Sequence, residues 1–143
     1  MHEVRIRIRW RDMDAYGHVN NAVYLNYLEE CRDAWAQSVL GSVVDPWDFV
    51  LARVAIDYRS ELTQHDEEIL VRCRLASIGR SSVRTREEIE KADGMIAAEA
   101  GSVIVPRDVA TGRSRPLGEA ELSALRKELN ADSERVADRE GGA

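Results

Sequence analysis

The chain has 143 residues, of which 44% are hydrophobic and 32% are charged, with a formal net charge of -6 and a pI near 5.1. This size fits one globular domain that can bury a core without disulfides or metal ions. The acidic balance, without a dense basic run, argues against nonspecific binding to nucleic acid. No apolar run approaches the roughly 20 residues of a membrane-spanning helix, and no secretory signal opens the chain. We therefore expect a cytoplasmic protein that does not insert into membranes.

Two patterned segments open the chain. Residues 3–10, EVRIRIRW, alternate, which predicts a half-buried strand whose inner face carries Val4, Ile6, Ile8 and Trp10. Residues 22–41, AVYLNYLEECRDAWAQSVLG, repeat apolar side chains at helical spacing and predict one long helix with a broad apolar stripe. Asn20 or Asn21 can cap its start, and Gly41 can end it. A helix this long and this apolar needs a sheet to cover it.

The rest of the chain supplies that sheet. Alternating or apolar patterns predict four further strands, over residues 49–62, 67–79, 81–94 and 95–108. Short turns join these strands, so we expect a largely antiparallel sheet. A shorter amphipathic helix follows over residues 116–129. These patterns predict an α+β fold, with one sheet around one long helix, as a single domain over residues 1–130 and a flexible tail over residues 131–143.

An unusually polar segment, WRDMDAYGHVNN, joins the first strand to the long helix over residues 10–21. Its two carboxylates, Asp12 and Asp14, lie close enough in sequence for their pKa values to be pushed apart. Gly17 allows a tight turn. The first amides of the following helix have no helical acceptor and lie at its positive end, so they can bind a carbonyl oxygen as negative charge develops there. A carboxylate beside such an oxyanion site is a minimal arrangement for hydrolysing an acyl group.

Other interpretations of these residues stay open on spacing alone. Asp-x-Asp before a helix is commonly a capping and turn device, and a lone histidine such as His18 is commonly a surface residue. The chain has no Gly-x-Ser-x-Gly elbow and no Ser-His-Asp order, and its three histidines lack metal-ligand spacing, so we expect no metal. Cys31 and Cys73 lie in apolar segments, and we interpret both as reduced packing residues, with a disulfide or a nucleophile as the alternative.

The segment RDMDAYGHVNNAVYLNYLEECR resembles the signature of hotdog-fold acyl-CoA thioesterases of the 4-hydroxybenzoyl-CoA thioesterase type, including the YbgC-like branch. The matching positions are Asp12, Asp14, Gly17, His18, Val19, Asn21, Tyr24, Tyr27, Glu29 and Arg32. A second block, IDYRSELTQHDEEILVRCRLASIGRSS, resembles the strand-turn-strand of the same family. The resemblance covers about residues 4–106 and implies the hotdog fold, in which an antiparallel sheet wraps around a central helix.

The resemblance also implies roles for the residues of the first motif. Asp14 matches the family's catalytic carboxylate, which acts either as a nucleophile on the thioester or as a base that activates water. The backbone N–H of Asn21 would polarise the thioester carbonyl, and Gly17 would line the approach to it. Asp12 would hold the loop by hydrogen bonds. His18 would orient Asp14 or the water.

The resemblance implies functional roles for further residues, on patterns less specific than the first motif. Glu29 is a second candidate for the catalytic carboxylate, because a related branch carries it on the helix; an ion pair with Arg32 is the alternative. The CoA phosphates would lie near polar side chains in two turns, Arg59, Arg80, Ser81 and Ser82. Glu61 stands where many relatives have proline, which changes the shape of that loop. Tyr24 and Leu28 would contribute to the walls of the acyl pocket.

The resulting hypothesis is an acyl-CoA thioesterase that forms a free carboxylic acid and CoA without a cofactor, since CoA is part of the substrate. One alternative is hydrolysis of acyl-carrier-protein thioesters, with arginines docking an acidic carrier. Another is a non-catalytic hotdog module that binds acyl-CoA. A curved sheet with exposed edges needs cover, so we expect a homodimer or homotetramer with sites at the subunit interface.

Overall fold

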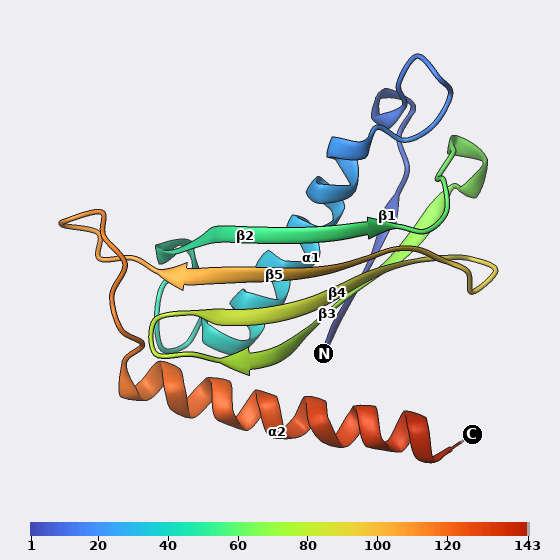
Figure 1. Cartoon of the computed structure of the whole chain (residues 1–143). Coiled ribbons are helices and arrows are strands. Elements are labelled where there is room, and N and C mark those ends of the chain that lie inside the picture. Colours follow the sequence, from blue (N-terminus) through green and yellow to red (C-terminus); the bar gives the residue numbers. More distant parts are fainter. Residues whose placement is uncertain (143) are drawn as a thin grey trace.

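A single five-stranded antiparallel sheet curves around the long helix α1 (Asn21–Leu40) in the computed structural model, which describes residues 1–142 (Figure 1). The strands lie in the order β1-β3-β4-β5-β2, with bounds β1 His2–Arg7, β2 Phe49–Tyr58, β3 Glu68–Ile78, β4 Val83–Lys91 and β5 Ile96–Pro106. Within the described residues there are three short 3-10 helices, η1 Trp10–Asp12, η2 Pro46–Asp48 and η3 Gln64–Asp66. The predicted arrangement of one sheet around one helix is confirmed.

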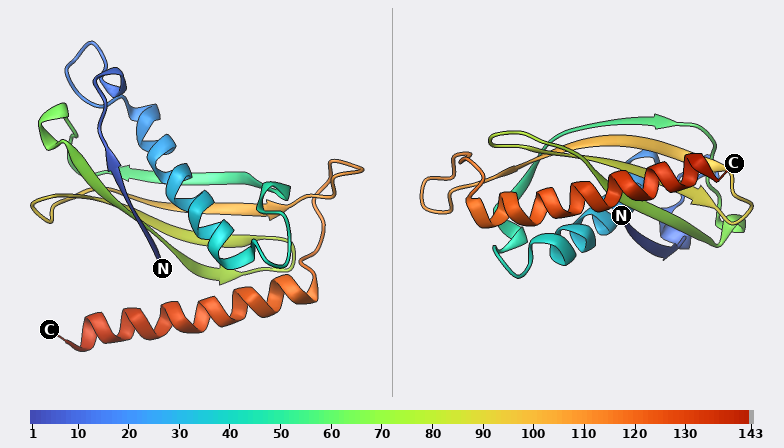
Figure 2. Two further views of the ribbon diagram at one scale, coloured as in Figure 1. Left: turned by 180° about the vertical axis from the view of Figure 1, so that it is seen from behind. Right: turned by 90° about the horizontal axis from the view of Figure 1, so that it is seen from below.

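Helix α1 fills the concave face of the sheet, as the view from behind shows (Figure 2). The Asn20 side chain caps it by accepting a hydrogen bond from the Ala22 N–H, and Gly41 follows its last turn, both as predicted. The buried stripe of α1 packs on the inward side chains of the strands. The fully buried core residues include Leu28, Cys31, Trp35 and Leu40 of α1 and Val71, Cys73 and Ile89 of the sheet. Both cysteines are free and buried, and burial raises the pKa of Cys31 to about 12. They are packing residues, as predicted.

The first strand is shorter than its pattern suggests. β1 ends at Arg7, and the side chain of Trp10 is 79% exposed rather than on the inner face. The chain turns here because the N–H of Arg9 donates to the carboxylate of Asp12 instead of to a neighbouring strand. The alternating sequence pattern therefore extends beyond the end of β1, because the Asp12 carboxylate turns the chain before the pattern stops.

The C-terminal helix corrects the prediction of a tail after residue 130. Helix α2 runs over Glu119–Gly141 beside β3. Its Asp132 is only 2% exposed and accepts a hydrogen bond of 2.9 Å from the Leu75 N–H. That amide needs a partner because β1 pairs with β3 only as far as Cys73. Neither α1 nor α2, nor any other helix within residues 1–142, is long and apolar enough to cross a membrane.

Candidate active site

Asp12 holds the loop between β1 and α1 from the inside. Its carboxylate is 2% exposed and accepts hydrogen bonds from the Arg9 N–H at 2.9 Å, the Tyr27 hydroxyl at 2.7 Å and the Arg9 guanidinium at 3.0 Å. Burial by itself raises the pKa of Asp12, but these donors outweigh it and hold the pKa below its ordinary value. Asp12 thus has the structural role that the motif predicted.

Asp14 lies in the turn that follows, with one carboxylate oxygen tethered and the other open. Its Oδ1 accepts from the Tyr16 N–H at 2.9 Å and from the His18 N–H at 3.4 Å, while its own N–H donates to the His18 carbonyl at 2.8 Å. Gly17 closes the turn with a φ of 81°, a conformation that favours glycine. Oδ2 has no hydrogen-bond donor within residues 1–142. A half-buried carboxylate therefore keeps one oxygen for a substrate or a water molecule.

The start of α1 offers one open amide. The Asn20 side chain accepts a hydrogen bond from the Ala22 N–H at 2.9 Å, and the Asn20 carbonyl accepts one from the Val23 N–H at 2.9 Å. The N–H of Asn21, the first helical residue, has no acceptor in the described part of the chain. The Tyr58 hydroxyl fixes this residue from the neighbouring β2 by donating to the Asn21 carbonyl at 2.9 Å. An unpaired N–H at the positive end of a helix can stabilise a developing oxyanion.

The side chain of His18 pairs with Glu61 and not with Asp14. Its Nε2 lies 2.8 Å from Oε2 of Glu61, and both side chains are about half exposed. Within residues 1–142, the hydrogen bonds between His18 and Asp14 involve only the main chain of His18, so the imidazole does not make the predicted orienting hydrogen bond there. The pair instead ties the Asp14 turn to the segment after β2. The sequence spacing did not predict this His18–Glu61 pair, although Glu61 was noted as standing where many relatives have proline.

Glu29 and Arg32 do not form the ion pair that their i,i+3 spacing suggested. Glu29 is exposed on α1, whereas Arg32 points into the core with 6% of its side chain exposed. Nη1 of Arg32 lies 3.2 Å from Oε1 of Glu87 and 3.3 Å from the Ser102 hydroxyl. The Thr85 and Ser102 hydroxyls also donate to the Glu87 carboxylate, at 2.8 and 2.7 Å. This buried polar cluster between α1, β4 and β5 was missed, because nothing in the sequence pairs residues so far apart.

Tyr24 and Leu28 fill the core of this chain and do not line an open pocket in it. They are 3% and 0% exposed. The Tyr24 hydroxyl donates to the Ser60 carbonyl at 3.2 Å and accepts from the Leu62 N–H at 3.0 Å, and its ring packs edge-on against Tyr58 with centroids 5.0 Å apart. Burial raises the pKa of Tyr24. Tyr24 thereby joins the end of β2 to the start of α1.

The residues predicted for the CoA phosphates are not brought together. The guanidinium of Arg59 is engaged by Glu99 at 3.0 Å and faces Asp57 at 3.9 Å. Arg80, Ser81 and Ser82 form the turn between β3 and β4, at the end of the sheet opposite the Asp14 loop (Figure 1). No group of three or more His, Cys, Asp or Glu side chains within residues 1–142 is arranged to hold a metal ion.

Comparison with known proteins decides the family. The family model described as the thioesterase-like superfamily matches residues 8–128. The chain belongs to this superfamily. Its α+β architecture is the hotdog fold that the opening motif predicted, and its reaction class is thioester hydrolysis.

Several relatives cover most of the chain. A thioesterase from Thermus thermophilus, solved in complex with coenzyme A and Zn, is 34% identical, with a TM-score of 0.80 over 90% of this chain and 94% of the other. A predicted thioesterase from Bacillus stearothermophilus is 25% identical, with a TM-score of 0.80 over 90% and 96% of the two chains. The long-chain acyl-CoA thioesterase FadM of Escherichia coli (strain K12) is 29% identical over 84% of this chain and 92% of its own.

Proposed function

We propose that the protein hydrolyses acyl-CoA thioesters to a free carboxylic acid and CoA, with Asp14 as the catalytic carboxylate and the Asn21 N–H as an oxyanion donor. The observation that carries this proposal is a carboxylate with one open oxygen in the same short loop as the open amide of α1. Membership of the thioesterase-like superfamily and similarity to FadM and to a CoA-bound thioesterase support it.

The reaction divides between these two groups. The thioester carbonyl oxygen accepts a hydrogen bond from the Asn21 N–H, which stabilises the negative charge that forms as the carbonyl carbon is attacked; such a donor is worth about 3 kcal/mol of barrier. As a general base, Asp14 removes a proton from the attacking water. As a nucleophile, it forms a mixed anhydride that water then cleaves. In both routes the carbon–sulfur bond breaks and the thiolate of CoA leaves and takes up a proton. Glu29, exposed on α1, stays the second candidate carboxylate.

Release of free thiol from a panel of short, long and aromatic acyl-CoAs tests the activity and defines the acyl group. We expect turnover with at least one acyl chain. Presenting the same acyl group on CoA and on acyl-carrier protein separates the two substrate classes, because only a carrier-specific enzyme would hydrolyse the second far faster. Binding of every acyl-CoA without thiol release would contradict the proposal and favour a binding module.

We also propose that two copies pair along β2 to form a homodimer. This strand lies at the edge of the sheet with ten residues, and its Leu51 and Tyr58 side chains are each 45% exposed. Such a long unpaired edge is normally covered. Antiparallel pairing would carry the β3–β4 turn of a second copy, with its Arg80, Ser81 and Ser82, toward the Asp14 loop. Light scattering should give twice the chain mass of 16.1 kDa or more; an active monomer would contradict a shared site.

A further inference from the structure

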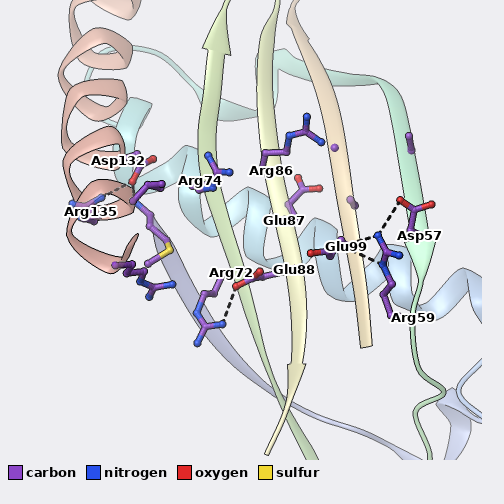
Figure 3. A pocket seen from close by; sticks show the side chains of 16 residues that line it. Asp57, Arg59, Arg72, Arg74, Arg86, Glu87, Glu88, Glu99, Asp132 and Arg135 are labelled. Atoms are coloured by element: carbon purple, nitrogen blue, oxygen red, sulfur yellow. Dashed lines mark hydrogen bonds and ion pairs between the residues drawn. The ribbon is translucent and has the colours of Figure 1, made fainter. Parts of the chain in front are cut away.

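A cavity lies on the outer face of the sheet, which is the face turned away from α1. It has a volume of about 620 Å³ and is bounded by the outer side chains of β2, β3, β4 and β5 and by the C-terminal half of α2 (Figure 3). Ligand sites of small molecules span roughly 300–1,000 Å³. The cavity contains neither Asp14 nor Asn21. It shares only Arg59 with the residues expected at the CoA phosphates, and Glu99 already engages that guanidinium at 3.0 Å.

Six arginines and five acids line the cavity, and four of the arginines contact neighbouring acids. Arg59 contacts Glu99, and Arg135 contacts Asp132 at 2.6 Å. A third, Arg72, is held by three glutamates, Glu3, Glu88 and Glu90, and Arg139 lies 3.7 Å from Glu3. These pairs are drawn as dashed contacts around the rim of the cavity in Figure 3, apart from those to Glu3 and Glu90. Because of these pairs, the carboxylates along the outer face already have arginine partners and are not available to other cations.

Arg74 and Arg86 are the exceptions. They lie directly opposite each other on β3 and β4, and neither has a carboxylate within 4.0 Å among residues 1–142. Like charges placed directly opposite on a sheet destabilise it. Two small residues lie next to Arg86 in the sheet, because Gly101 is its partner on β5 and Ala55 is the partner of Gly101 on β2. A Cβ added at Gly101 would lie 3.2 Å from Nη1 of Arg86, so the small residue leaves room for the guanidinium.

We propose that Arg74 and Arg86 bind a small phosphate-bearing molecule in this cavity. Two adjacent guanidinium groups match phosphate oxygens in geometry and charge, and a bound anion would remove the repulsion between them. The acids around the rim and the net charge of -6 favour a compact anion over an extended nucleic acid. The site goes beyond the proposed thioesterase activity and does not depend on it.

Inorganic pyrophosphate is the probe, and its binding is measured by calorimetry and by thermal melting at a constant ionic strength set with NaCl. Wild-type protein should bind and melt at a higher temperature with pyrophosphate. Arg74→Gln and Arg86→Gln should each weaken binding by about tenfold or more, since each removes charge-assisted hydrogen bonds. Without pyrophosphate, Arg86→Gln should melt no lower than wild type and should release thiol from acyl-CoA at the wild-type rate.

Arg84→Gln is the matched control, because Arg84 lies two residues earlier on the same strand and outside the cavity lining. Gly101→Ala gives a neutral second variant, which should weaken binding by crowding Arg86 while keeping both charges. The proposal is overturned if wild type responds to pyrophosphate no more than to NaCl, or if Arg84→Gln and Arg86→Gln weaken binding equally. It is also overturned if Arg86→Gln lowers the oligomer mass while pyrophosphate fails to bind, since the face would then be a contact between copies.

Discussion

Replacing Asp14 with asparagine should lower kcat for acyl-CoA hydrolysis by about a hundredfold to ten-thousandfold, the usual contribution of a catalytic acid or base. The amide oxygen of asparagine can still accept the hydrogen bond from the Tyr16 N–H that Oδ1 accepts now, so the turn should persist. What is lost is the basic, nucleophilic oxygen. Affinity for an acyl-CoA, measured by calorimetry with the inactive variant, should stay within a few-fold of the wild-type value.

Asp45→Asn is the matched control for this substitution. Asp45 caps a similar exposed turn, with Oδ1 accepting from the Trp47 N–H at 3.0 Å, but it follows the C-terminal end of α1, whereas Asp14 precedes the N-terminal end. Its variant should keep full turnover. If Asp14→Asn also keeps full turnover, Asp14 is not the catalytic carboxylate, and Glu29→Gln becomes the variant to measure.

Replacing Arg32 with methionine should lower the free energy of unfolding by about 3–5 kcal/mol, the usual cost of leaving a buried charge without its partner. Glu87 is 3% exposed, and it would retain the Thr85 and Ser102 hydroxyls but lose its only cation within 4.0 Å in the described chain. Urea denaturation followed by fluorescence measures the change. The cost should also appear as a lower melting temperature.

A double variant separates the charge from the packing. Arg32→Met combined with Glu87→Gln should recover much of the loss, because both buried charges are then gone and the amide can still bond to the two hydroxyls. Arg126→Met, at an exposed position of α2, should change stability by no more than about 0.5 kcal/mol. Equal effects of Arg32→Met and Arg126→Met would show that the buried pair contributes nothing to stability.

The features of the fold and of the candidate site that could be predicted are those that depend on local sequence patterns. The helical spacing of Tyr24, Leu28 and Trp35, together with the cap at Asn20, identified α1. The alternation of Ile69, Val71, Cys73 and Leu75 identified the inner face of β3. The opening motif also distinguished Asp12 from Asp14, and the structure confirms the loop-holding contacts of Asp12. The catalytic role of Asp14 and the cytoplasmic location stay predictions.

Two of the incorrect expectations concern residues whose partners are far away in the sequence. Asp132 lies in a polar segment that resembled a frayed tail, yet it satisfies an amide of β3 that β1 is too short to reach. Arg32 looked like a surface partner of Glu29, yet its partner is Glu87, 55 residues away. In both cases a polar side chain is buried, and composition alone places such residues in solvent.

The sequence by itself determined which faces of α1 and the strands are apolar and where the helix begins, because backbone periodicity and capping depend on neighbours within a few residues. Only the tertiary structure decided which polar groups meet. The register of β3 on β4 sets Arg74 opposite Arg86, and the curvature of the sheet around α1 buries Arg32 beside Glu87. Register and curvature are properties of the whole sheet, so no local pattern encodes these contacts.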